Sequence, residues 1–105
     1  MYITINNKKV LLKEAKSFKD KFLGFMGKKN IDYAIIFKNN GIHTFFMKEP
    51  IDVILTDKNY KVLYTYKNLQ KNKIILPKRK VYYTIELPNN TIKKTCINEI
   101  ITIHD

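Results

Sequence analysis

The chain has 105 residues, of which 45% are hydrophobic and 12% aromatic, and its formal net charge is +11 at pH 7. A chain of this length forms one domain, residues 1–105, with one modest core, and a second lobe is excluded. The apolar content excludes a disordered chain, because burial of these side chains can offset the loss of conformational entropy.

The N-terminal residues predict a β-hairpin. Residues 2–5 alternate in polarity as a half-buried strand does, and residues 9–12 can return as the second arm. Asn6 and Asn7 between them tolerate the positive φ of a two-residue turn.

Residues 17–26 predict one short helix. The apolar residues that share a helical face are Phe18, Phe22, Phe25 and Met26. Ser17 can cap the first turn, and Gly27 can supply the left-handed residue after the last turn. We expect the aromatic face of this helix to cover the hydrophobic core.

The rest of the chain predicts short strands separated by turns. The expected strands are residues 33–37, 42–47, 51–56, 60–66, 73–76, 81–87, 91–94 and 100–103. Pro50 separates two of them, because proline cannot donate to a strand ladder. The tyrosine row Tyr60, Tyr64 and Tyr66 should share one strand face with Val62. Many short strands with one helix predict a mainly β fold, an antiparallel β-sandwich or barrel.

Localisation and redox state follow from what the sequence lacks. Residues 1–10 contain no apolar stretch of signal-peptide length, and no run approaches the roughly 20 apolar residues of a membrane span. The single cysteine, Cys96, cannot form an internal disulfide, which fits a reducing compartment. Its neighbours TIKKTCINEI include no histidine, so a buried thiol is favoured over a nucleophile. We expect a cytoplasmic monomer.

Four segments in succession carry a resemblance to a known family. AKSFKDKFLGFMGKK, YAIIF, IHTFFMKEPIDVILTDKNYKVL and YYTIELPNNTI resemble the bacterial and archaeal family catalogued as domain of unknown function 192. The resemblance covers residues 15–103 and implies a jelly-roll-like sandwich with one short helix near residues 17–26. It implies no reaction. Lys21 departs from the arginine usual in the family, and Asn90 from the usual turn glycine.

The segment IHTFFMKEPID contains most of the candidate ligand-binding residues. The full set is His43, Thr44, Met47, Lys48, Asp52 and Glu86. For His43, a buried imidazole bonded to a backbone carbonyl is favoured over a general base or metal ligand. Asp52 follows Pro50 at a strand entry, where a carboxylate commonly ties down loop N–H groups. Glu86 is either exposed or directed into a second face of the strand.

His43, Asp52 and Glu86 also have the residue types for acid–base chemistry or a facial metal site, although their spacing follows no motif. The chain has no HExxH, no paired CxxC and no phosphate-cradling glycine loop, so we expect no metal and no cofactor. We expect His104, next to the last residue, to fray in solvent.

The segment PKRKVYYT suggests a second kind of site. Lys78, Arg79 and Lys80 precede Tyr82, and cations beside an aromatic ring are typical of single-stranded nucleic-acid binding. A solvated turn before a core strand is favoured instead, because Arg79 is the only arginine among 20 basic residues and phosphate recognition usually relies on arginine.

The sequence therefore favours a small binding module that holds a small ligand or a protein partner near IHTFFMKEPID. One alternative is an enzyme that uses His43, Asp52 and Glu86. The other is a basic domain that binds a polyanion such as nucleic acid through the +11 charge.

Overall fold

The computed structural model describes residues 1–15, 25, 27–44 and 47–105. Its strands are β1 (Tyr2–Ile5), β2 (Lys8–Glu14), β3 (Ala34–Phe37), β4 (Ile42–His43), β5 (Ile51–Thr56), β6 (Val62–Leu69), β7 (Ile74–Ile75), β8 (Tyr83–Pro88) and β9 (Ile103–His104). The described residues include no helix long and apolar enough to cross a membrane. The helix expected near residues 17–26 lies outside the described residues, except for Phe25, whose side chain is fully buried.

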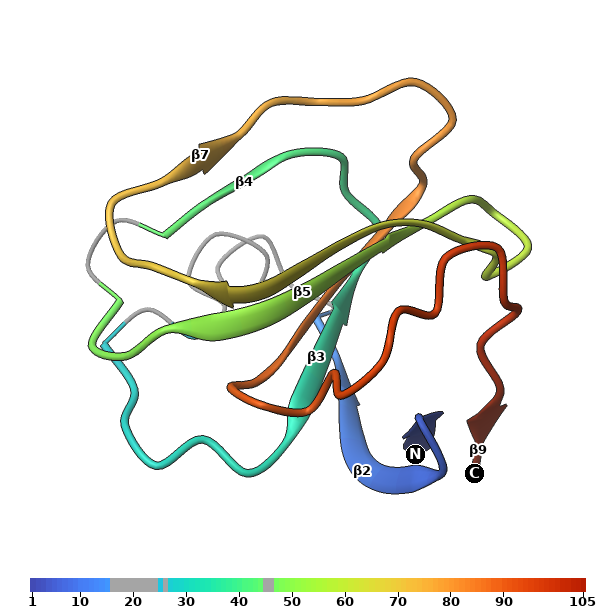
Figure 1. Ribbon diagram of the computed structural model, residues 1–105, viewed down its shortest axis with the longest axis horizontal. Coiled ribbons are helices and arrows are strands. Elements are labelled where there is room, and N and C mark those ends of the chain that lie inside the picture. The colour runs from blue at the N-terminus through green and yellow to red at the C-terminus, as the bar shows by residue number, and fades with distance from the viewer. Residues whose placement is uncertain (16–24, 26, 45–46) are drawn as a thin grey trace.

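Seven strands form one mixed sheet in the order β6-β5-β8-β3-β2-β1-β9, and β4 pairs with β7 in a separate small sheet (Figure 1). The predicted mainly β class is confirmed. The expectation that all strands are antiparallel is wrong at one pair, because β2 and β3 run parallel, with Glu14 opposite Ile36. Parallel neighbours need a long crossover connection, and the separation in sequence between Glu14 at the end of β2 and Ala34 at the start of β3 is long enough for one.

The N-terminal hairpin follows the prediction. β1 pairs antiparallel with β2, and Asn6 and Asn7 have φ angles of 49° and 67°, the positive values that a two-residue hairpin turn requires. On its other side β1 pairs with β9, where His104 Nε2 lies 3.1 Å from Thr4 Oγ1. The expectation that His104 frays is therefore wrong, although its side chain is exposed.

Apolar side chains lie on both faces of the seven-stranded sheet. Ile54 and Ile85 belong to one buried cluster, the first core, whereas Val53 and Leu55 belong to another, the second core. The alternation along β5 places these clusters on opposite faces. Cys96 lies in the first core with 5% of its surface exposed, so the predicted buried thiol is confirmed. Burial, followed by the nearby charge of Glu99, raises the pKa of this thiol.

The tyrosine row is split by an irregularity in strand pairing. β5 has the predicted bounds, but its pairing with β6 shifts register between Leu55 and Thr56. Val62 therefore lies opposite Thr56 and packs in the first core, whereas Tyr66 packs against the second core. The expectation of one shared face is wrong, because a bulge moves later side chains to the other face.

Residues 91–94, which the sequence predicted as a strand, form no strand in the structure.

Candidate functional site

Asp52 ties two loops to the sheet. It lies on β5 opposite Leu87, on the face of the first core, and is completely buried. One carboxylate oxygen accepts the backbone N–H of Asn68 and the other accepts the N–H of Ile92, both at 2.8 Å. The carboxylate thus holds the end of β6 and the segment after β8, as the loop-anchoring interpretation predicts.

Glu86 points into the opposite face of the same sheet. It lies on β8 between Ile35 of β3 and Val53 of β5, both members of the second core, and is 4% exposed. Its Oε1 accepts the backbone N–H of Phe25 at 3.3 Å. Burial raises the pKa of this carboxyl to about 7, although the hydrogen bond from Phe25 acts in the opposite direction.

Thr44 fastens the small sheet to the loop before β7. Its hydroxyl accepts the N–H of Lys73 at 2.7 Å and donates to the carbonyl of Gln70 at 2.8 Å. His43 pairs with the exposed Ile74, whereas the neighbouring Ile42 packs against the second core. Because side chains alternate along a strand, the half-buried His43 faces away from the second core.

Replacing Thr44 with valine should lower the free energy of unfolding by about 2 kcal/mol. Valine has nearly the same shape, but the Lys73 N–H and the Gln70 carbonyl would lose the hydroxyl that they share. Urea unfolding measures the change. Thr44→Ser keeps the hydroxyl and should cost about 1 kcal/mol for the lost methyl group. A valine variant as stable as the serine variant would contradict this role.

The six predicted ligand residues do not surround one cavity. Asp52 faces the first core and Glu86 the second, while Met47 is buried in the second core and Lys48 is exposed. Within the part of the chain that the structure describes, no group of three or more His, Cys, Asp or Glu side chains could hold a metal ion. The structure therefore does not bring His43, Asp52 and Glu86 together for chemistry on one substrate.

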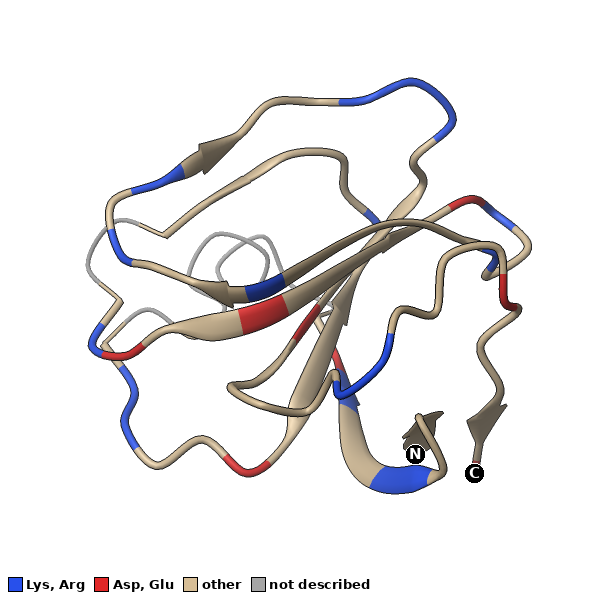
Figure 2. Cartoon of the chain, viewed as in Figure 1, with Lys and Arg blue, Asp and Glu red and all other residues tan. Residues whose placement is uncertain are grey.

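The basic turn lies between β7 and β8. Lys78, Arg79 and Lys80 form one of several cationic stretches that Figure 2 shows on the loops. Lys78 Nζ lies 5.3 Å from the ring centroid of Tyr64. Its ammonium thus covers one face of the tyrosine ring, a stabilising cation–π arrangement that takes that face away from base stacking.

Tyr82 is arranged in a similar way. Lys38 Nζ lies 5.5 Å from its ring centroid, and a hydrogen bond to Tyr82 is the main cause that raises the pKa of the Lys38 ammonium. Lys80 and Tyr82 also line a pocket of about 360 Å³ in which Asp57 adds a negative charge. These contacts favour a structural role for the cations over a role in a continuous surface that binds a polyanion.

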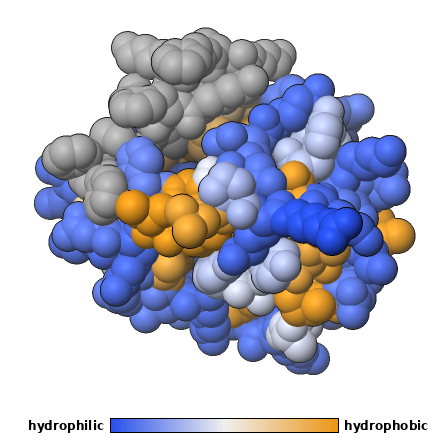
Figure 3. Space-filling model, turned by 90° about the horizontal axis from the view of Figure 1, so that it is seen from above, coloured by the Kyte–Doolittle hydropathy of each residue, from blue (hydrophilic) through white to orange (hydrophobic). Residues whose placement is uncertain are grey.

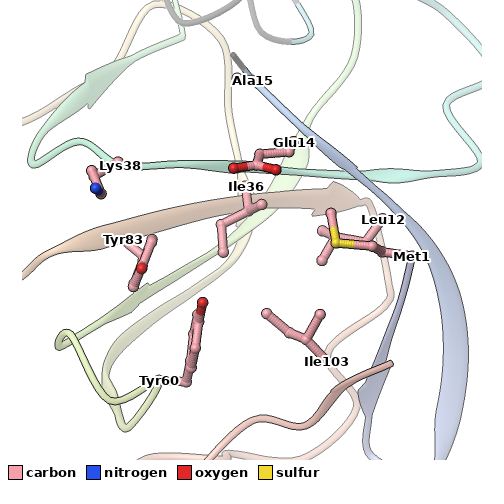
Figure 4. A pocket seen from close by; sticks show the side chains of 9 residues that line it. All are labelled: Met1, Leu12, Glu14, Ala15, Ile36, Lys38, Tyr60, Tyr83 and Ile103. Atoms are coloured by element: carbon pink, nitrogen blue, oxygen red, sulfur yellow. The ribbon is translucent and has the colours of Figure 1, made fainter. Parts of the chain in front are cut away.

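A further pocket lies elsewhere, beside the ends of β2 and β3. It has a volume of about 410 Å³ and lies beside the first core, and we call it the Glu14 pocket (Figure 4). Its apolar lining consists of Met1, Leu12, Ala15, Ile36 and Ile103, and its polar lining of Glu14, Lys38, Tyr60 and Tyr83. A few polar groups above an apolar floor, at this volume, are typical of small-molecule sites.

The turn before β6 positions the aromatic wall of the pocket. The carboxylate of Asp57 accepts the N–H groups of Asn59 and Lys61 at 2.8 and 3.0 Å, which folds the turn. Tyr60 within it has a φ of 65°, an uncommon conformation for an aromatic residue. Its ring stacks on Tyr83, with centroids 4.8 Å apart and an interplanar angle of 14°.

The sequence did not reveal this pocket because it depends on strand pairing. Glu14 ends β2 and Lys38 follows the end of β3, and parallel pairing brings these two strand ends to the same edge of the sheet. Antiparallel pairing, which the sequence predicted, would have placed them at opposite edges. Within β2, the residues Leu12, Lys13 and Glu14 alternate as in any half-buried strand. No local signal in the sequence therefore marks Glu14 as a pocket residue.

Exposed apolar side chains are the remaining candidate feature. Figure 3 shows apolar atoms between hydrophilic ones on the face seen from above, and Ile74 and Leu76 are exposed at β7 and just after it. Scattered exposed apolar side chains are normal on protein surfaces, so we assign them no function.

The fold and the site together define a mainly β protein with a small amphiphilic pocket. The model of the DUF192 family, described as an uncharacterized ACR, matches residues 1–103. The chain therefore belongs to this family, as the resemblance implied.

Archaeal relatives support the assignment. The chain is 34% identical over 95 residues to UPF0127 protein TK1120 of Thermococcus kodakarensis, covering 84% of this chain and 60% of that protein. It is 41% identical over 81 residues to UPF0127 protein PH1112 of Pyrococcus horikoshii, covering 70% of this chain and 69% of the relative. The chain thus spans about 60% of the length of the first relative. These relatives are themselves uncharacterised, so the family has no established function.

Two crystal structures share the fold. A protein from Sinorhizobium meliloti 1021, provisionally described as a transcription regulator, superimposes with a TM-score of 0.78 at 14% identity, over 96% of this chain and 89% of that one. A protein of unknown function from Novosphingobium aromaticivorans gives 0.69 at 12% identity, over 85% and 71%. At these identities the likeness concerns the fold alone.

Proposed function

We propose that this protein is a small binding module that holds a small, partly apolar ligand in the Glu14 pocket. The observation that carries the proposal is the pocket itself, in which Glu14 and Lys38 stand beside an apolar floor of Leu12, Ile36 and Ile103. Two of the other polar residues considered as ligands are engaged in the fold, because Asp52 and Thr44 both bond to backbone groups of loops. The proposed site therefore differs from the IHTFFMKEPID segment that the sequence favoured.

The proposal extends to the architecture and setting of the protein. The small sheet of β4 and β7 contributes Ile42 and Ile75 to the second core, opposite the larger sheet, which supports a jelly-roll-like sandwich. The buried, unpaired thiol of Cys96 supports a reducing, cytoplasmic compartment. We propose one domain that acts as a monomer.

A fragment screen by NMR tests the proposed site. Small aliphatic and aromatic fragments should shift backbone amide signals around Leu12, Ile36 and Ile103 more than elsewhere. Replacing the half-buried Ile103 with tryptophan should fill the pocket and raise the dissociation constant of the best fragment at least about tenfold. Ile97→Trp is the matched control, because Ile97 is exposed and lies outside the pocket.

The spectrum of each variant without fragment shows first whether it is folded. Fragments that shift signals only at other places, or that bind the Ile103→Trp variant as well as the control, would overturn the proposed function.

A further inference from the structure

The polar groups of the Glu14 pocket carry opposite charges at its two sides. Figure 4 shows the Glu14 carboxylate above Ile36, and the Lys38 ammonium farther along the same rim. Both residues lie on the face of the first core, because Glu14 is opposite Ile36 and Lys38 follows Ile36 by two positions. The parallel pairing of β2 with β3 thus presents one anion and one cation to the same cavity.

The Glu14 carboxylate has acceptor capacity to spare. Within the part of the chain that the structure describes, it makes no hydrogen bond and no ion pair, although its charge reaches both Lys38 and Tyr60. The Lys38 ammonium rests against Tyr82 at the edge of the pocket and is fully exposed. Two opposite charges that face one cavity without pairing with each other are complementary to a ligand that carries both.

The tyrosine wall adds neutral donors. A hydrogen bond with Tyr83, followed by burial, raises the pKa of Tyr60 to about 12, so its hydroxyl keeps its proton at neutral pH. Figure 4 shows this hydroxyl directed toward Tyr83 on the Glu14 side of the pocket. The rings provide a semi-rigid wall, because Tyr60 stacks on Tyr83 and Tyr82 packs edge-on against Tyr83 with centroids 4.8 Å apart.

We propose, on the basis of the binding function above, that the Glu14 pocket takes a zwitterionic aliphatic α-amino acid. The Glu14 carboxylate accepts hydrogen bonds from the ligand ammonium, Lys38 donates to the ligand carboxylate, and the aliphatic side chain lies on Leu12 and Ile36. A volume of about 410 Å³ suits one such molecule.

Charge explains why other small apolar ligands fit less well. A fatty acid of the same size would bring a second carboxylate toward Glu14, and a simple aliphatic amine would leave Lys38 without a counterpart. A ligand that repels one of the two charges, or leaves one of them without a partner, is less complementary to the site than a ligand that carries both charges.

Calorimetric titration with three matched probes tests the inference. L-Leucine should bind at least about tenfold more tightly than isoamylamine, which lacks the carboxylate, and than 4-methylpentanoate, which lacks the ammonium. Glu14→Gln should weaken leucine binding about tenfold and leave the binding of 4-methylpentanoate unchanged or tighter. Lys38→Gln should also weaken leucine binding about tenfold, but it should leave the binding of isoamylamine unchanged or tighter. Glu99→Gln, an exposed glutamate outside the pocket, should change none of these values.

The outcomes separate this inference from the function on which it rests. If isoamylamine or 4-methylpentanoate binds in the pocket as tightly as leucine, or leucine binding is indifferent to Glu14→Gln, the amino-acid assignment is overturned and the binding function stands. If none of the probes and none of the fragments shifts the signals of Leu12 and Ile36, both are overturned.

Discussion

Asp52→Ala should destabilise the protein by on the order of 4 kcal/mol, because two buried backbone N–H groups lose a charged acceptor. The Asn68 and Ile92 N–H groups each lie 2.8 Å from a different carboxylate oxygen, and the side chain is completely buried, so water cannot readily replace it. A loss of this size is a large part of the total stability of a small domain. Urea unfolding followed by circular dichroism measures it.

Asp57 provides a matched control. Its carboxylate also accepts two backbone N–H groups, those of Asn59 and Lys61, but it is only half-buried in a surface turn. Asp57→Ala should cost about 1 kcal/mol, since solvent can reach the released groups. Equal losses for the two variants would contradict the importance of burial at Asp52. Asp52→Asn should fall between them, because an amide keeps one acceptor oxygen and replaces the other with a donor.

Glu86→Gln should have the opposite effect and stabilise the protein above neutral pH. The buried carboxyl of Glu86 has a pKa raised to about 7 from 4.5, so the folded state binds its proton more tightly than the unfolded state does. Stability from this group is therefore full below about pH 4.5 and is lost as the pH rises through 7. The difference amounts to about 3 kcal/mol at pH 8. Glutamine keeps the acceptor for the Phe25 N–H and carries no charge.

Unfolding measured at several pH values checks this result. The wild-type protein should lose stability between pH 4.5 and 8 relative to the glutamine variant, and the two should be nearly equal at pH 4. A glutamine variant that is less stable than wild type at pH 8 would show that the charged form of Glu86 is the one that the fold requires.

These two carboxylates also illustrate how far the sequence alone could lead. It identified Asp52 as an anchor of loop N–H groups, because its place after Pro50 at a strand entry is a local signal. For Glu86 it left two faces open, since alternation along a strand does not tell which face is covered. Only the packing of Ile35 and Val53 around it, from the strands on either side, decides that Glu86 is buried.

Local chemistry by itself determined the mainly β class, the N-terminal hairpin, the bounds of β5 and the burial of Cys96. The first three depend on side-chain periodicity or on a turn residue such as Asn6, and the last on the apolar character of a thiol with no histidine near it in sequence; all of these act over a few residues. The succession of segments also identified the family. These features need no knowledge of which strands become neighbours.

The tertiary structure alone decided the features that depend on pairing between distant segments. The bulge that sends Val62 and Tyr66 to different faces arises from the register of β6 against β5. The Glu14 pocket arises because β2 and β3 run parallel, which brings Glu14 and Lys38 to one edge. Both depend on interactions between residues far apart in the chain, and the periodicity of a single strand carries no information about its neighbour.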